Sequence, residues 1–229
     1  MIPLRDVIPS RTKPGITVTL IVINVLVFLF QLSLSERGGL AFIYTFGVVP
    51  ADFTFISVFT SMFVHAGLAH IGGNLLFLWI FGDNVEDRLG HVRFVAFYFA
   101  CGAIAALSQA LLNPESIVPM VGASGAIAGV MGAYLVLYPH SRVLMLFPFP
   151  LFVFELPAIV FLGFWFFIQF LNGINQLPVF ERDAISGGVA FWAHVMGFVS
   201  GLILVVFMKR PERTTVDWWD TMPSQKSDF

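Results

Sequence analysis

The sequence predicts an all-α membrane protein, a bundle of six transmembrane helices with both termini in the cytoplasm. Three observations lead to this prediction. Hydrophobic residues make up 58% of the 229 residues and charged residues 11%, whereas an ordinary globular domain carries about 25% charged residues. Six apolar segments are candidates for crossing a bilayer. The lysines and arginines gather in alternate connections between these segments, as the positive-inside rule describes.

A transmembrane helix needs about 20 mostly apolar residues. The six candidate segments are Ile16–Leu34, Ala66–Phe81, Val92–Leu112, Ala123–Tyr138, Pro157–Leu171 and Gly188–Met208. The fifth segment is predicted to begin at Pro157, because Pro148 and Pro150 interrupt the apolar run before it. Val143–Leu156 is therefore expected to form an interfacial or bent connection rather than a further crossing.

The six segments divide the chain into three parts. Residues 1–15 are predicted to be a cytoplasmic N-terminal segment, residues 16–208 the six-helix membrane domain and residues 209–229 a polar cytoplasmic tail. The first apolar run is too long for a signal peptide and has no small-residue cleavage site, so we interpret it as a permanent span.

The basic residues predict the orientation of the bundle. With the N-terminus inside, ten of the twelve lysines and arginines lie on the cytoplasmic side, and only Arg37 and Arg182 lie outside. The second, fourth and sixth segments then all enter the membrane from the outer side. Five polar residues near their outer ends converge on one shallow layer of the bilayer, namely His65, His70, Asn74, Ser124 and His194. Polar groups at such a depth are usually functional.

Ser124 and His194 are the candidate nucleophile and general base. A serine hydroxyl needs a neighbouring base to accept its proton, and an imidazole suits this task near neutral pH. Each residue heads a helix face of small residues, which are Ser124, Ala128 and Gly132 on one segment and His194, Gly197 and Gly201 on the other. Such faces allow close approach of two membrane helices, so the two side chains are expected to meet.

His70 and Asn74 are candidate donors to an oxyanion. They are four residues apart and share a helix face, and both can donate hydrogen bonds. The backbone N–H of Ser124 near a helix start is a third candidate donor. The alternative is that His70 and Asn74 only join helices by hydrogen bonds. No acidic residue is a good third member, so a Ser–His dyad is predicted.

A metal site is the other possible use of the histidines. The spacing of His65 and His70 is poor for two ligands on one helix face, and neither a carboxylate nor a cysteine joins them and His194 at that depth. We therefore predict neither a metal nor another cofactor.

Three motifs carry a resemblance to the rhomboid family of intramembrane serine proteases. His65–Asn74 reads HAGLAHIGGN and continues to the VEDRLG of Val85–Gly90. The second motif is the GASG of Gly122–Gly125, and the third is the AHVMG of Ala193–Gly197, followed by Gly201. Their order on a six-helix background is similar to that of a prokaryotic rhomboid protease.

The resemblance implies a role for each motif residue. Ser124 and His194 would be catalytic, and His70, Asn74 and Gly122 would bind the oxyanion or substrate. Structural support is implied for His65, Gly125, Gly197, Gly201, Glu86 and Arg88. A tyrosine that stacks on the histidine in some members is Ala128 here, so the sequence does not reveal how His194 is oriented.

The sequence thus predicts an intramembrane serine endopeptidase that cleaves transmembrane or juxtamembrane segments near the outer membrane face. Its expected partners are transmembrane protein substrates and the lipid bilayer, with no nucleic acid, and its expected location is a prokaryotic cell membrane. The fifth segment and the loop Asn172–Gly187 are candidate gates for substrate. The alternatives are a non-catalytic family member that binds transmembrane helices, and a small transporter or channel.

Overall fold

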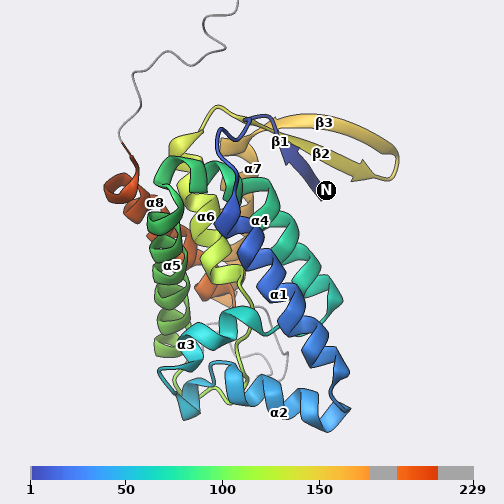
Figure 1. The fold of residues 1–229 in the computed structure, drawn as a ribbon, viewed down its shortest axis with the longest axis vertical. Helices are drawn as coiled ribbons and strands as arrows, with labels where there is room; N and C mark the ends of the chain where they lie inside the picture. The colour runs from blue at the N-terminus through green and yellow to red at the C-terminus, as the bar shows by residue number, and fades with distance from the viewer. Residues whose placement is uncertain (1, 176–189, 211–229) are drawn as a thin grey trace, which may run out of the picture.

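The computed structural model describes residues 2–175 and 190–210. In chain order the elements are β1 (Ile2–Asp6), α1 (Gly15–Ser33), α2 (Glu36–Phe46), η1 (Pro50–Asp52), α3 (Ser57–Thr60), η2 (Ser61–Phe63), α4 (Leu68–Leu89), α5 (His91–Leu112), α6 (Ser124–Leu137), β2 (Arg142–Pro148), β3 (Leu151–Pro157), α7 (Ala158–Asn175) and α8 (Phe191–Met208). A helix occupies each of the six predicted segments (Figure 1). Most of the predicted gate loop Asn172–Gly187, and the tail beyond residue 210, lie outside the described residues.

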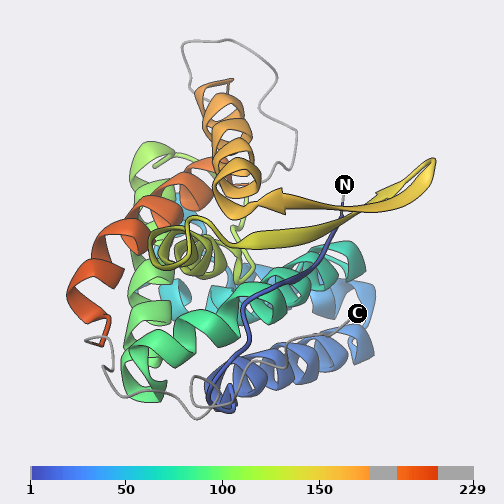
Figure 2. The same cartoon turned by 90° about the horizontal axis from the view of Figure 1, so that it is seen from above.

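Helix α6 lies at the centre of the bundle. Figure 2 shows it end-on, with α4, α5, α7 and α8 around it. Its residues Gly125–Tyr134 are all buried, and a helix that is apolar on every side belongs in a core. The residue at the start of α6 is therefore held by protein on several sides.

Four described helices are long and apolar enough to cross a membrane, namely α1, α5, α7 and α8. A fifth candidate is the pair formed by Ser57–Phe63 and Leu68–Leu89, which is bent by 94°. Helix α6 is apolar but has only 14 residues, or about 21 Å at 1.5 Å per residue, which is less than the hydrocarbon thickness of about 30 Å. The helices thus lie where the sequence predicts them, while six crossings and cytoplasmic termini stay predictions.

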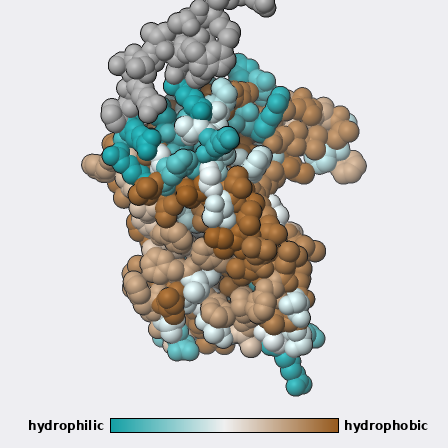
Figure 3. All heavy atoms as spheres, viewed as in Figure 1, coloured by the Kyte–Doolittle hydropathy of each residue, from teal (hydrophilic) through white to brown (hydrophobic). Residues whose placement is uncertain are grey.

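Charged and polar residues gather at one end of the bundle, where α4 ends and α5 begins. Figure 3 shows this hydrophilic end above a hydrophobic belt. Helix α4 continues beyond the predicted Phe81 to Leu89, because its polar last turns bind other parts of this end. Asn84, for example, donates to Asp6 of β1 through Nδ2 at 3.0 Å.

Glu86 and Arg88, predicted to be a structural pair, both make contacts at this end. The buried carboxylate of Glu86 accepts the backbone N–H groups of Ile16 and Thr17 at 2.9 and 2.8 Å, and it also contacts His91 Nδ1. The guanidinium of Arg88 lies 6.0 Å from the ring centroid of Tyr138. Glu86 thus caps α1, whose first N–H groups have no partner within their own helix.

A three-stranded antiparallel sheet in the order β1-β2-β3 lies at the same end. The all-α prediction omits this sheet. Val143–Leu156, expected to be an interfacial or bent connection, lies within the β2–β3 hairpin. Two features hide the strands in the sequence. The hairpin is apolar on both faces, so it lacks the alternation of polar and apolar residues that marks a half-buried strand. The second partner of β2 is β1, which is distant in the sequence: Asp6 pairs with Val143.

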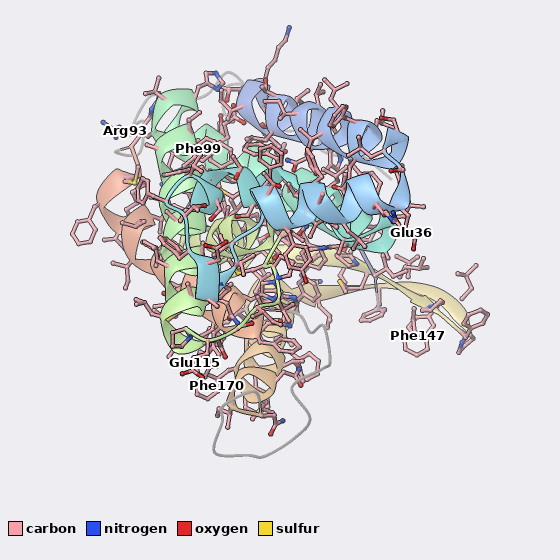
Figure 4. All side chains as sticks on the ribbon, turned by 90° about the horizontal axis from the view of Figure 1, so that it is seen from below. Glu36, Arg93, Phe99, Glu115, Phe147 and Phe170 are labelled. Carbon is pink, nitrogen blue, oxygen red and sulfur yellow. The ribbon has the colours of Figure 1, made fainter. Side chains whose placement is uncertain are left out.

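The opposite end of the bundle carries the segments that hold the start of α6. Figure 4 shows α2, which begins at Glu36, lying across this end. The loop after α2 and the loop before α6 form an antiparallel bridge between Val48 and Met120. The N–H of Gly122 donates to the carbonyl of Ser61 at 2.8 Å. These backbone bonds fix the approach to Ser124.

Candidate active site

Helices α6 and α8 meet through backbone atoms. A Cβ atom on Gly197 would collide with the carbonyl oxygen of Gly125, and one on Gly201 with that of Gly129. A Cβ on Gly132 would collide with the carbonyl oxygen of Phe198. The two helices approach closely, as the small residues predict. On α6 the contact is made by Gly125 and Gly129 as well as by Gly132 of the predicted face. Glycine lets the two backbones touch.

This contact brings Ser124 and His194 together. Ser124 is the first residue of α6, and His194 lies in the first turn of α8. The Oγ of Ser124 and the Nε2 of His194 are 2.8 Å apart, which is a good hydrogen-bond distance. Both side chains are half-buried. A hydroxyl in contact with an imidazole nitrogen is the arrangement that activates a serine nucleophile.

Helix α7 contacts the other side of His194. The Nδ1 of His194 is 2.8 Å from Oε1 of Gln169, and the Trp165 ring lies 5.8 Å from the imidazole, centroid to centroid, at 34°. The sequence analysis did not identify either residue. The signal for Gln169 was present, because it is the first polar side chain in α7, and such residues in membrane helices are usually functional. Trp165 thus packs against His194, the contact that the family resemblance implies for a tyrosine at position 128, where this chain has alanine.

His70 and Asn74 lie on α4 beside the loop that precedes Ser124. A Cβ built on Gly122 would stand 2.6 Å from Nε2 of His70 and 3.4 Å from Nδ2 of Asn74. Gly122 has a φ of +113°, which favours glycine. The peptide before Ser124 can therefore lie directly against the side chains of His70 and Asn74.

The amide of Asn74 carries one of six buried side-chain polar atoms without a hydrogen-bond partner in the described part of the chain. Among the described residues its Nδ2 has no hydrogen-bond partner, although the side chain is buried. A buried donor without a partner costs about 1–3 kcal/mol, and such groups need an explanation. A substrate oxygen arriving next to Gly122 would supply the missing acceptor.

His65 is fully buried and supports the start of α4. Its carbonyl accepts from Nε2 of Gln31 at 2.6 Å, and its N–H donates to Oε1 of the same residue at 3.3 Å. Its ring lies 5.2 Å from that of His70, centroid to centroid. His65 therefore links α1 to His70 through Gln31, a partner that the sequence does not predict, and its supporting role stays a prediction.

Comparison with known proteins identifies the family. The model of the Rhomboid domain matches residues 52–211. Rhomboid protein 1, mitochondrial, of Saccharomyces cerevisiae is 34% identical over 203 residues, which cover 84% of this chain and 53% of that protein. RHOMBOID-like protein 6, mitochondrial, of Arabidopsis thaliana is 32% identical over 64% of this chain and 43% of its own length.

A bacterial protein is also similar. Rhomboid protease GluP of Bacillus subtilis is 37% identical over 87 residues, 38% of this chain and 17% of that protein. The chain spans about half or less of the length of these curated relatives. The apolar helices and the matched domain together identify a multi-pass membrane protein. The chain belongs to the rhomboid family.

Proposed function

We propose that this protein is an intramembrane serine endopeptidase that cleaves transmembrane or juxtamembrane segments of membrane proteins near the outer membrane face. The observation that carries the proposal is the 2.8 Å contact between Ser124 Oγ and His194 Nε2. A helix-binding protein without catalytic activity has no need for this contact, and neither does a channel. The family to which the chain belongs supports the same reaction.

The reaction follows from the contact. Ser124 Oγ attacks the scissile carbonyl carbon while its proton moves to Nε2 of His194. The resulting imidazolium gives this proton to the leaving amine as the C–N bond breaks, which leaves an acyl-enzyme. A water molecule then attacks the ester, gives a proton to Nε2, and the proton returns to Ser124 as the carboxylic acid product leaves.

The negative charge on the carbonyl oxygen needs donors that are already in place. His70, Asn74 and the backbone N–H of Ser124 are the proposed donors, and Gly122 supplies the close backbone approach. The unpartnered Nδ2 of Asn74 supports this role. Loss of one such donor lowers kcat by about 100-fold to 1000-fold in a well-studied serine protease.

The substrate is proposed to be a transmembrane helix that unwinds before cleavage, because a helical peptide bond is shielded and hydrogen-bonded. Helix α7 is the proposed gate. Only Ala158, Leu162 and Gly173 of its residues are buried, so it leaves the bundle more easily than α6 does. The remainder of the predicted gate, residues 176–187, lies outside the described residues.

The proposed location is a cell membrane, with the charged end of the bundle in the cytoplasm. The asymmetry of the basic residues supports this orientation. The names of the relatives include mitochondrial and chloroplastic proteins as well as a Bacillus subtilis protease, so the proposal of a prokaryotic cell membrane rests on the resemblance of the six predicted segments to the prokaryotic type.

The test uses the purified protein in liposomes with a reporter transmembrane substrate. Ser124→Ala is expected to abolish cleavage without changing the circular dichroism spectrum or the elution volume. A fluorophosphonate probe is expected to label the unaltered protein at Ser124, and His194→Ala is expected to remove this labelling. Cleavage by purified Ser124→Ala protein would defeat the proposal, and substrate binding without cleavage by the unaltered protein would favour the non-catalytic alternative.

A further inference from the structure

A neutral side chain on α7 contacts the imidazole nitrogen that faces away from Ser124. We propose that Gln169 is a positioning residue that selects the tautomer of His194, an inference that rests on the proposed function. Its side-chain carbonyl accepts the Nδ1–H at 2.8 Å. Nε2 is then unprotonated on the side of Ser124, also at 2.8 Å.

The contact between Gln169 and His194 decides which imidazole nitrogen carries the proton. A neutral imidazole carries one N–H, on either Nδ1 or Nε2, and the partner of one nitrogen decides the state of the other. A carbonyl oxygen only accepts, so it favours the proton on Nδ1. In a triad protease a buried carboxylate has this task, and loss of the correct tautomer lowers kcat by about 10⁴-fold. An amide can do the same without placing a charge inside the bilayer.

The contact also connects the base to α7. Trp165 lies four residues before Gln169, on the same face of the helix, and its ring packs against His194. Helix α7 thus touches the imidazole at two points. Movement of α7 away from α8 would remove both contacts. His194 is therefore held in the proposed tautomer and orientation only while α7 is packed against α8.

Steady-state kinetics of Gln169→Leu and Gln169→Glu test this role. Gln169→Leu is expected to lower kcat by about tenfold to hundredfold with KM changed less than about twofold, a smaller effect than loss of a triad carboxylate. Gln169→Glu restores an acceptor and is expected to recover most of kcat. Because a carboxylate stabilises the imidazolium, the acidic limb of its kcat profile should move to higher pH. A role in packing alone would not move that limb.

Two results would overturn the assignment of Gln169: an unchanged kcat in Gln169→Leu, or a pH profile of Gln169→Glu identical to that of the unaltered protein. Neither result affects the proposed protease activity, which is tested separately with Ser124→Ala. Conversely, activity that survives in Ser124→Ala would remove the proposed function itself.

A different observation, on the other end of the molecule, carries a second inference. The hairpin β2–β3 contains a run of twelve apolar residues, 143–154, without any polar side chain. Arg142 and Glu155 bracket this run and form an ion pair at 3.2 Å. The hairpin projects sideways from the bundle (Figures 1 and 2), and Phe147 stands near its far end in Figure 4. Figure 3 shows it as a hydrophobic protrusion beside the hydrophilic end.

The exposure of the hairpin's apolar side chains indicates that it has an interaction partner other than water. Phe149 is 86% exposed and Leu151 76% exposed, and exposed apolar patches of this kind mark an interaction surface. The sheet order excludes the hydrocarbon centre. Strand β3 is at an edge, and open edges do not occur in lipid hydrocarbon, because their backbone groups need partners. The boundary between headgroups and acyl chains satisfies both conditions.

We propose that the β2–β3 hairpin lies in this boundary layer, on the membrane side away from Ser124, with lipid as its partner. Its apolar surface continues into the exposed residues Ile159, Val160 and Phe164 of α7, which belong to a helix long enough to cross the bilayer. Helix α7 begins directly after β3, and Ala158 N–H donates to the carbonyl of Ser141 at 2.7 Å. Lipid contact of the hairpin would therefore hold the first turn of α7 at a constant depth.

The test places a fluorescent dye on a single cysteine at residue 151, made as Leu151→Cys with Cys101→Ala, in liposomes that contain lipids with nitroxides at known depths. Headgroup and upper-chain nitroxides are expected to quench the dye more strongly than nitroxides near the chain ends. Aqueous iodide is expected to quench it at least about threefold less than the same dye on Pro9→Cys, an exposed position in the loop before α1.

The opposite pattern would overturn the lipid proposal: iodide quenching equal to that of the Pro9→Cys control, with no quenching by lipid nitroxides. An apolar hairpin exposed to water in the purified protein would then be the binding surface of another protein. Strongest quenching by chain-end nitroxides would also contradict the proposal, since it would place an open sheet edge in the hydrocarbon.

Discussion

The carboxylate of Glu86 on α4 accepts two hydrogen bonds from Thr17 on α1, from the backbone N–H at 2.8 Å and from the hydroxyl at 2.7 Å. The contact joins residues that are 69 positions apart at the charged end of the bundle. It also satisfies donors of α1 that would otherwise be buried without partners. The start of the first helix is therefore fixed by a residue in the last turns of α4, beyond the end of the second predicted span.

Loss of this cap is expected to destabilise the bundle. Glu86→Ala leaves the N–H groups of Ile16 and Thr17 without acceptors, at about 1–3 kcal/mol for each unsatisfied buried donor. Thermal unfolding in detergent should show a melting temperature several degrees lower. Glu86→Gln keeps one acceptor oxygen and should lose less. Equal melting temperatures for Glu86→Ala and the unaltered protein would show that α1 is held by other contacts.

Gly201→Ala is expected to separate α6 from α8. The added methyl group would collide with the carbonyl oxygen of Gly129, and overpacking of a core costs about 1–3 kcal/mol. Both the melting temperature and the cleavage rate should fall, because the same contact sets the distance between Ser124 and His194. Gly163→Ala on α7 is the matched control, since a Cβ there meets nothing within 4 Å. A Gly201→Ala protein that behaves like Gly163→Ala would contradict the backbone contact.

Asn74→Leu is expected to separate activity from stability. Removal of a proposed oxyanion donor should lower kcat about 100-fold or more, with little change in KM. Because the Nδ2 of Asn74 has no partner among the described residues, its loss should leave the melting temperature unchanged or raise it. Parallel measurement of kinetics and thermal unfolding tests both parts. A large loss of stability would instead identify Asn74 as a structural link between helices.

The pH dependence of stability is expected to contain a contribution from Asp6. Burial raises the pKa of this carboxyl above its ordinary value of 3.8, although Tyr134 donates to it at 2.6 Å. The folded protein thus holds the proton more tightly. This contribution stabilises the fold below pH 3.8 and is lost as pH rises through the pKa of the folded state.

Asp6→Asn is expected to remove the loss of stability that accompanies deprotonation of Asp6 as pH rises. Relative to the unaltered protein, its melting temperature should increase as pH rises from about 4 to about 7. The carboxyl of Asp6 also acts on the neighbouring carboxyl of Asp83, so the comparison is made between variants rather than by the absolute slope. Asp52→Asn, at an exposed position, is the control. A difference between Asp6→Asn and the unaltered protein that is the same at every pH would contradict the prediction.

The sequence predicts the positions of the helices and the meeting of Ser124 with His194, because both depend on local patterns. Apolar runs mark the six helices, and the small residues around Ser124 and His194 indicate a close contact between their two helices. The hydrogen bond between these side chains is consistent with that contact. Their catalytic roles stay predictions until they are tested.

Two features, the strand partner of β2 and the contact of α7 with His194, depend on how distant segments pack. The strand partner of β2 is the N-terminal segment Ile2–Asp6, which has no recognisable strand pattern of its own. Gln169 and Trp165 are two residues of an almost wholly apolar helix, and only the rotation of α7 in the bundle decides that they face His194. Periodicity does not give that rotation when nearly every side of a helix is apolar.

The main-chain contact between Gly125 and Gly197 has a consequence for how the protein can vary. The separation of α6 from α8 is set there by peptide planes, which have no rotamers to adjust. The many phenylalanines on the outside of the bundle can therefore be exchanged for other lipid-compatible residues to suit a thicker or more fluid bilayer, while the two helices that carry Ser124 and His194 keep their separation.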